Sequence, residues 1–329
     1  MKFVQGNIRL WPPVIFLLVA FTTTLEAATL VEIEELRLSG ELSKAQVLAD
    51  EQVRQPGISA VDKVALHLEL ARIHDRIGLH QNTRPVAESL VNIESAAILA
   101  AEAGPTSAAE VELALSDYYY RAEMQDREFP VAEKHALRAI ERFRQLDDGH
   151  GEADAVHRLG LIEMQRSKLA EARQLFEQSK ELDIAAGERV FFSGEYERHV
   201  GFVLYLSGEI PASAPYFERS FKARLEAGAI DASIFAAISL GGVLGELKRS
   251  DEGESYLNYA IDLAKEIQSP VALARAQLAL GRLYSNSGDI EAARLAYLAS
   301  VEAADSVHLQ SIVRQAREEI QEPGENPTE

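Results

Sequence analysis

Apolar residues return at helical spacing along most of the chain that follows residue 28. In the series Leu66, Leu70, Ile73 and Ile77, an apolar side chain recurs every three or four residues. Such spacing places these side chains on one face of an α-helix. No run of Val, Ile and Thr with strict apolar–polar alternation stands out as a strand. The pattern therefore predicts an all-α protein.

Turn signals recur at regular intervals and divide the predicted helices into pairs. Gly40, Gly78, Gly208 and Gly288 are expected at the turn inside a pair, where a glycine can adopt the left-handed conformation that ends a helix. An acid follows three of them and favours the start of the next helix. Stop signals such as Gly104-Pro105 separate one pair from the next. The predicted pairs span 29–57, 58–105, 106–149, 150–187, 188–228, 229–268 and 269–304.

A final helix is predicted over about 305–321. Ile312 and Ile320 would face inward and cover the last pair, whose apolar face would otherwise be exposed. Residues 322–329 contain two prolines, one glycine and three acids, and are expected to be a disordered tail. Residues 28–321 are therefore predicted to form one continuous repeat domain.

A large apolar residue followed by glycine returns in four consecutive pairs. The glycines are Gly160, Gly201, Gly241 and Gly281, which lie 41, 40 and 40 residues apart. A fixed period of about 20–50 residues is typical of stacked repeat architectures.

The second helix of each of these pairs carries a small–bulky–small pattern. Ala172, Phe176 and Ser179 follow Gly160, and the three equivalent positions after Gly281 are Ala293, Tyr297 and Ser300. Small residues allow two helices to approach closely, and one bulky side chain per pair fills the remaining space.

With these residues the chain resembles the tetratricopeptide repeat family, over about 29–304 and most strongly over 150–304. The family's early Trp and closing Pro are missing, and the interval near 40 residues exceeds the family's period of about 34, which indicates longer helices. Armadillo-like helical pairs are the alternative. The resemblance implies a right-handed superhelical solenoid of helix-turn-helix repeats, whose concave groove, lined by the first helix of each pair, binds peptides or proteins.

Charge and cysteine content narrow the classes of function. Lys and Arg number 33 against 52 Asp and Glu, which gives a formal net charge of −19. That charge disfavours binding to nucleic acid and to anionic membrane surfaces. The chain has no cysteine, so it has no disulfide, thiolate metal site or cysteine nucleophile.

The N-terminus has the order of a secretory signal peptide. Lys2 and Arg9 precede an apolar run over 14–21, and small residues follow up to Ala27 and Ala28. The run is far shorter than the ~20 residues of a spanning helix, and no second apolar span follows. The chain is therefore predicted to be cleaved near Ala27. Removal of residues 1–27 would leave the protein in the periplasm. The alternative is an uncleaved N-terminal anchor with the protein facing the periplasm.

Arginines and aromatic residues are expected in the groove. Counting from the small residue of each first helix gives the candidate binding residues Tyr120, Arg121, Arg158, Arg198, His199, Phe202, Tyr205 and Arg282, and the last pairs add Phe235, Glu246 and Arg275. The expected groove cations are all arginine, and the guanidinium fork suits carboxylates. The alternative is that these arginines form ion pairs with neighbouring acids, and that Tyr120 is a packing residue.

Metal and catalytic sites are not expected. His157 and His199 are predicted to approach each other across adjacent pairs, but no carboxylate has a suitable ligand spacing with them, so no metal site is predicted. No nucleotide-binding loop, zinc-protease motif or nucleophile elbow occurs. The sequence therefore indicates a non-enzymatic protein without a cofactor.

The predicted function is binding of a protein or peptide in the bacterial cell envelope, as a scaffold or assembly factor. The partner would carry an acidic segment or a C-terminal carboxylate, to match the groove arginines. The alternative is a sensory module that takes a small ligand or peptide and signals to a membrane partner.

Overall fold

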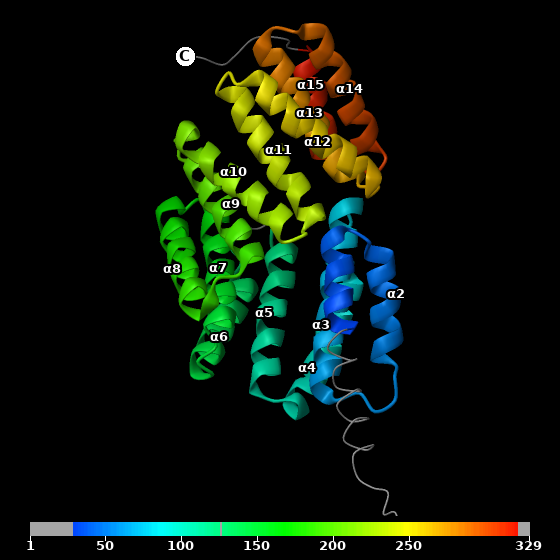
Figure 1. The fold of residues 1–329 in the computed structure, drawn as a ribbon, viewed down its shortest axis with the longest axis vertical. Helices are drawn as coiled ribbons and strands as arrows, with labels where there is room; N and C mark the ends of the chain where they lie inside the picture. The colour runs from blue at the N-terminus through cyan, green and yellow to red at the C-terminus, as the bar shows by residue number, and fades with distance from the viewer. Residues whose placement is uncertain (1–28, 126, 322–329) are drawn as a thin grey trace, which may run out of the picture.

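The structure is a computed structural model, and it describes residues 29–125 and 127–321. Every regular element within these residues is a helix (Figure 1). The predicted all-α solenoid of helical repeats is confirmed. The predicted signal peptide and C-terminal tail lie outside the described residues. Within them, no helix combines the length and the apolar character that crossing a membrane requires.

The helices follow one another as antiparallel pairs. Residues 29–39 are helical and precede α2 (Leu42–Val53). The next six pairs are α3 (Ala60–Gln81) with α4 (Ala87–Ala103), α5 (Pro105–Ala122) with α6 (Pro130–Gln145), α7 (Gly149–Gln165) with α8 (Leu169–Gly187), α9 (Val190–Leu206) with α10 (Ile210–Glu226), α11 (Ile230–Glu246) with α12 (Ser250–Glu266), and α13 (Pro270–Ser287) with α14 (Ile290–Asp305). The last described helix is α15 (Gln310–Gln321), which packs on α13 and α14.

The glycines of the first helices are sites of close approach. A Cβ added at Gly160 would lie 2.7 Å from the ring of Phe176, and one at Gly281 would lie 2.4 Å from the ring of Tyr297. Buried serines of the second helices complete this contact, because they donate to backbone carbonyls of the first helices. Ser179 Oγ, for example, donates to Ala153 O at 2.8 Å. The small–bulky–small pattern thus fixes the spacing within each pair.

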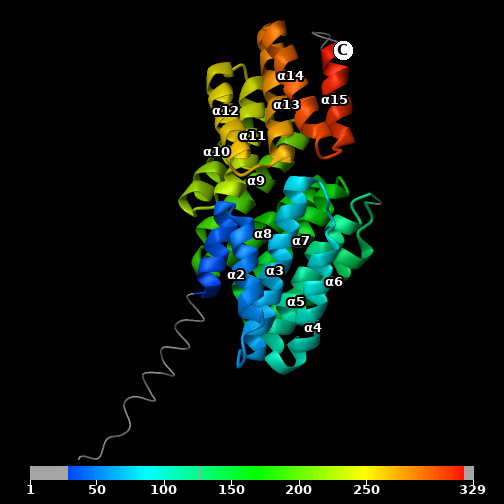
Figure 2. The same cartoon turned by 90° about the vertical axis from the view of Figure 1, so that its right-hand side faces the viewer.

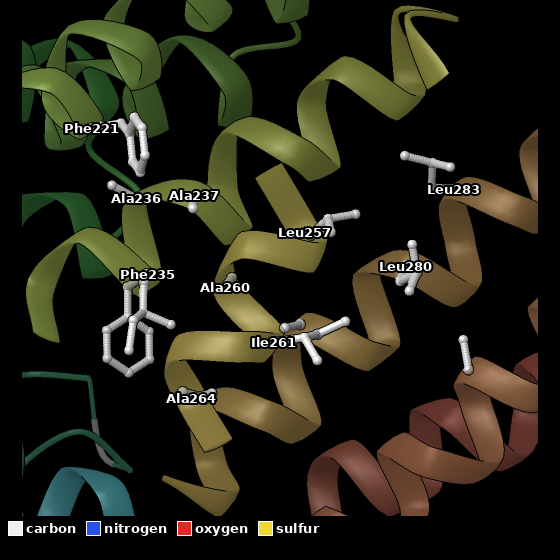
Figure 3. Packing of buried hydrophobic residues seen from close by; sticks show 14 residues of the cluster. Phe221, Phe235, Ala236, Ala237, Leu257, Ala260, Ile261, Ala264, Leu280 and Leu283 are labelled. Carbon is white, nitrogen blue, oxygen red and sulfur yellow. The ribbon is translucent and has the colours of Figure 1, made fainter. Parts of the chain in front are cut away.

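Apolar side chains fill the space between successive pairs. Figure 3 shows the largest of these clusters, which includes Phe221, Ile261 and Leu280 from three consecutive pairs. Alanines such as Ala236 and Ala264 are buried in the same cluster. Stacking therefore buries a series of apolar clusters along the array.

The turns agree with the sequence prediction at three of four glycines. Gly40, Gly208 and Gly288 have φ values of +91°, +80° and +87°. Gly78 is different, because α3 continues through it and ends only at Asn82, which has φ +56°. The prediction of a turn at Gly78 is wrong. This glycine is needed for packing instead, since an added Cβ would lie 2.3 Å from Val86 Cγ2.

The array closes on itself, which is unusual because a repeat normally contacts only its neighbours. The C-terminal end of α3 reaches the beginnings of α11 and α13, as Figures 1 and 2 show. His80 and Arg76 contact Asp231, and Asn82 Nδ2 donates to Val307 O at 3.2 Å. We call the contacts of Arg76, His80 and Asn82 with these later helices the α3 closure.

Candidate functional site

A pocket of about 760 Å³ lies among the first helices of the last three pairs. Its lining comes mainly from α9, α11, α13 and α15, and this volume falls within the range of ligand sites in proteins. Aromatic and aliphatic side chains, including Phe202, Phe235, Ile238 and Leu278, alternate with charged ones along it.

Two adjacent glycines of α11 show how the sequence leaves this space open. Gly241 faces the second helix of its pair, where an added Cβ would lie 2.6 Å from Leu257 Cγ. Gly242 points the other way and lines the pocket, and an added Cβ there would have no atom within 4 Å. The first glycine therefore serves packing, and the second leaves room in the pocket.

Arg198 of α9 lines this pocket and forms no ion pair among the described residues. Its guanidinium donates to His199 Nε2 at 3.2 Å and lies 4.8 Å from the centre of the Phe202 ring. Its Nε is buried without a hydrogen-bond partner. Burial lowers the pKa of Arg198 to about 10, and the charges of Arg224 and Arg275 act in the same direction, whereas the carboxylate of Glu195 opposes them. An anion at this position would relieve both effects.

Arg275 of α13 faces the same space. Burial lowers its pKa, and none of the described carboxylates forms an ion pair with it. Arg198 and Arg275 thus line one pocket, and the charge of Arg275 helps to lower the pKa of Arg198. Two arginine forks facing one cavity are a suitable receptor for a carboxylate.

The charges at the other end of the pocket are largely paired. Tyr205 Oη donates to Glu246 Oε1 at 2.7 Å, and burial together with this carboxylate raises the pKa of Tyr205 to about 12. Arg282 Nε donates to Glu319 Oε1 of α15 at 2.9 Å. Lys248 Nζ lies 3.4 Å from the carbonyl oxygen of Asn286. Arg282 is therefore neutralised, whereas Arg198, Arg275 and Lys248 form no ion pair among the described residues.

Seven of the eleven predicted groove residues line this pocket, namely Arg198, Phe202, Tyr205, Phe235, Glu246, Arg275 and Arg282. Arg121 and Arg158 instead form ion pairs with acids of the preceding first helix. Arg121 Nε lies 2.6 Å from Asp75 Oδ1, and Arg158 contacts Asp117. These two arginines thus follow the alternative of pairing with neighbouring acids, and the series of ion pairs stops before Arg198.

Tyr120 and His199 also lie outside the pocket lining. Tyr120 is buried and stacks on Phe129 with ring centres 5.4 Å apart, below the guanidinium of Arg158. Residues of α15, notably Gln315 and Glu319, line the pocket although the sequence pointed only to a capping role for that helix. The alternation of inward apolar and outward polar positions in 305–321 does not indicate that Gln315 and Glu319 line a pocket.

Comparison with known proteins identifies the repeat. A family model described as tetratricopeptide repeat matches residues 274–306, the segment that contains Gly281 and Tyr297. The described residues therefore have a tetratricopeptide-like fold. No curated protein sequence gives a significant match.

Solved structures share the tetratricopeptide-like fold at low sequence identity. BtubC (BKLC) from P. vanneervenii has a TM-score of 0.52 and 14% identity over 72% of this chain and 91% of its own. A Rap protein, described as complexed with Competence and Sporulation Factor, has a TM-score of 0.52 and 12% identity over 91% and 97%. Aspartyl phosphate phosphatase F from Bacillus subtilis has a TM-score of 0.55 and 10% identity over 89% and 77%. At these identities the likeness shows the fold alone.

A buried polar cluster joins two neighbouring tetratricopeptide-like pairs. His157 Nε2 lies 3.0 Å from His199 Nδ1, as the predicted approach of these residues required. Glu195, one turn before His199, offers a carboxylate oxygen, and the ligand atoms of the three residues lie within 4.8 Å of one another. The expectation that no carboxylate accompanies these histidines is therefore wrong, because the turn of α9 brings Glu195 to the same face.

The surroundings of this cluster fit a hydrogen-bond chain better than a metal. Glu195 Oε1 accepts from Arg224 at 2.6 Å, and His199 Nε2 accepts from Arg198. A neutral His199 then carries its proton on Nδ1 and donates it to His157 Nε2. Burial lowers the pKa of His157 to about 3 and that of His199 well below its ordinary value. A divalent cation here would have to displace these hydrogen bonds among several arginines.

Proposed function

We propose that this tetratricopeptide-like array binds a peptide or an extended protein segment in the pocket of α9, α11, α13 and α15, without catalysing a reaction. The observation that carries the proposal is the pair of guanidiniums, Arg198 and Arg275, that line a partly apolar pocket and form no ion pair among the described residues. Aromatic residues and arginines supply most of the binding energy at many protein interfaces, and Phe202, Tyr205 and Phe235 line the same space.

The ligand would carry an acidic residue or a C-terminal carboxylate. Arginine binds carboxylates with two parallel hydrogen bonds, and a partly desolvated site strengthens them. The whole chain is strongly acidic, so the local cations of the pocket set it apart from the rest of the surface. The Rap protein, which shares the fold, is itself described as complexed with Competence and Sporulation Factor, and this supports a ligand-binding role for the array.

The binding test compares two charge-removing variants of the mature chain. A library of short synthetic peptides is screened for binding to the mature chain by fluorescence anisotropy. The affinity of the tightest binder is then measured for the wild type and for the double variant Arg198→Gln/Arg275→Gln. We expect the double variant to lose binding by about a hundredfold or more, since each charge-assisted contact contributes about 1.5–3 kcal/mol. Arg294→Gln, an exposed arginine of α14 outside the pocket lining, is the matched control.

Salt gives a second criterion, because screening weakens the attraction between exposed charges. Binding that survives both the double variant and high salt would refute this pocket as the site. If no peptide binds and a small anionic molecule shifts the melting temperature instead, the sensory-module interpretation replaces the scaffold.

We further propose that the chain acts in the bacterial cell envelope as a scaffold or assembly factor. The support is the basic–apolar–small order of residues 1–28. N-terminal sequencing of the periplasmic fraction should give a chain that begins near Ala28. Recovery of a chain that begins at Met1 in the membrane fraction would favour the N-terminal anchor.

A further inference from the structure

We propose that the α3 closure and the pocket are coupled: a ligand in the pocket holds α3 against α11 and α13, and release of α3 weakens binding of the ligand. This inference rests on the proposed function, and it adds how the binding site is regulated. The first two pairs of the array, whose described residues contribute none of the pocket lining, would thereby control a site formed by the last pairs.

One residue of α3 joins the beginnings of two helices that line the pocket. His80 Nε2 lies 3.0 Å from Oδ1 of Asp231, in the first turn of α11. His80 Nδ1 lies 2.6 Å from Oγ of Ser269, the N-cap residue of α13. All three residues are buried. The position of His80 is therefore tied to the beginnings of both α11 and α13.

The same two helices continue as walls of the pocket. Phe235, one turn after Asp231, lines the pocket, and its ring stacks on that of His80 with ring centres 6.3 Å apart. Gly242 of α11 and Arg275 of α13 line the same space further along their helices. We therefore expect a change in the position of α3 to move side chains that line the pocket.

Charge gives a second connection between the closure and the pocket. Arg76 Nε lies 3.2 Å from Oδ2 of Asp231, and although burial opposes it, the charges of Asp231 and Glu195 raise the pKa of Arg76. Besides burial and the charge of Arg224, the charge of Arg76 helps to lower the pKa of Arg198, against the carboxylate of Glu195. The docked α3 thus brings a like charge toward Arg198. An anion bound by Arg198 would offset this repulsion and favour the docked position.

The closure is an addition to the contacts that hold the pairs together. In a repeat array each pair is stabilised mainly by its neighbours, and α3 packs against α2, α4 and α5 apart from the closure. Release of the closure would therefore leave the pairs folded. Because coupling between two equilibria is reciprocal, the ligand must strengthen the closure by the same factor by which the closure strengthens binding, typically about 5–150-fold.

The first measurement needs no substitution. Hydrogen exchange of the full mature chain is followed by mass spectrometry with and without a saturating concentration of the tightest-binding peptide from the screen. The amides of residues 78–83, at the end of α3, should exchange at least about fivefold more slowly with the peptide bound, although none of these residues lines the pocket. The amides of α6, which takes part in neither the closure nor the pocket lining, are the control.

The second measurement separates docking of α3 from a local change beside Phe235. His80→Ala removes the contacts with Asp231 and Ser269, and it should weaken peptide binding at least about fivefold. The closure is then held by a covalent bridge between Thr83→Cys and Gln310→Cys. Both positions are exposed and lie close in sequence to the hydrogen bond between Asn82 and Val307 O.

The bridge is specific because the chain has no cysteine of its own. A flexible bismaleimide joins the two introduced thiols in the His80→Ala background, and the bridged protein should recover the affinity of the wild type. The same protein treated with N-ethylmaleimide carries the same substitutions without the bridge, so it is the matched control and should stay weak.

The outcomes separate the two proposals. Unchanged exchange at residues 78–83 with the peptide bound would overturn the coupling and leave peptide binding standing. A folded His80→Ala chain that binds like the wild type, or whose affinity the bridge does not restore, would overturn it as well. If His80→Ala does not fold, the exchange measurement on the wild type decides. Absence of binding by every library member would overturn the proposed function, and this inference with it.

Discussion

The imidazole of His80 in the second helical pair lies 3.0 Å from the carboxylate of Asp231 in the sixth pair. Arg76 Nε approaches the other oxygen of Asp231 at 3.2 Å. The side chain of Asp231 is only 1% exposed, and although burial opposes it, the charge of Arg76 and the contact with His80 hold the pKa of Asp231 below its ordinary value. A single buried carboxylate therefore connects distant parts of the array.

The first prediction concerns this carboxylate. Asp231→Ala should lower the free energy of unfolding by about 3 kcal/mol or more, because it leaves Arg76 and His80 without their buried partner. Asp251 is the second residue of α12, as Asp231 is of α11, but it is exposed. Asp251→Ala should therefore cost less than about 1 kcal/mol. Urea denaturation measures both, and equal losses would show that the α3 closure adds no stability.

The helical pairs could be predicted from the sequence because their determinants are local. The glycines at 40, 208 and 288 end helices by adopting positive φ, and the spacing of Gly160, Gly201, Gly241 and Gly281 gives the register. The α3 closure could not be predicted in this way. Periodicity within one pair contains no information on a contact with the sixth pair, and the glycine at 78 pointed to a helix end that the structure places at Asn82.

For the candidate site, the sequence predicts only the position of each residue relative to the glycine of its first helix. Counting from Gly201 and Gly281 selected Arg198, Phe202, Tyr205 and Arg282, which line the pocket. The same counting also selected Arg121 and Arg158, whose charges Asp75 and Asp117 neutralise in the folded chain. Whether an arginine is paired depends on the geometry between successive pairs, which the sequence pattern does not specify.

The second prediction concerns the close approach of helices within a pair. Gly281→Leu should destabilise the protein by about 1–3 kcal/mol or more, because the new side chain would overlap the ring of Tyr297. Gly242→Ala is the matched change at an open helical position, and it should stabilise by up to about 1 kcal/mol through helix propensity. Thermal melts of the two variants should move in opposite directions. Melts that coincide would show that the repeat register is wrong.

The third prediction concerns α15. Its buried residues Val313 and Ala316 cover the last pair, and Glu319 accepts from Arg282 at the edge of the pocket. A chain that ends at residue 309 should melt about 5 °C or more below the full mature chain, since the apolar face of the last pair is exposed. It should also bind the selected peptide more weakly. A chain that ends at residue 321 is the control, and equal behaviour of the two truncations would argue against docking of α15.

The last prediction concerns the pH dependence of stability near His157. Burial lowers the pKa of this side chain to about 3 against the attraction of Glu195, and the charges of Arg158, Arg224 and Arg198 lower it further. An unfolded histidine has a pKa of about 6.5, so between about pH 6.5 and pH 3 the unfolded chain binds a proton that the folded chain does not. Stability is therefore fully present above about pH 6.5 and falls as the pH decreases through this range.

The matched variants are His157→Phe and His308→Asn. Phe removes the titrating ring at a site where the imidazole already contacts Phe176 and Phe192, whereas His308 is exposed. Each buried histidine contributes at most about 1.4 kcal/mol per pH unit to the slope of stability. Urea melts between pH 7 and pH 5 should give His157→Phe a slope about 1 kcal/mol per unit shallower than that of the wild type, with His308→Asn unchanged. Equal slopes of stability against pH for all three proteins would mean that His157 takes up its proton in the folded state. The hydrogen-bond chain from Arg198 through His199 would then have to include a charged His157 imidazole.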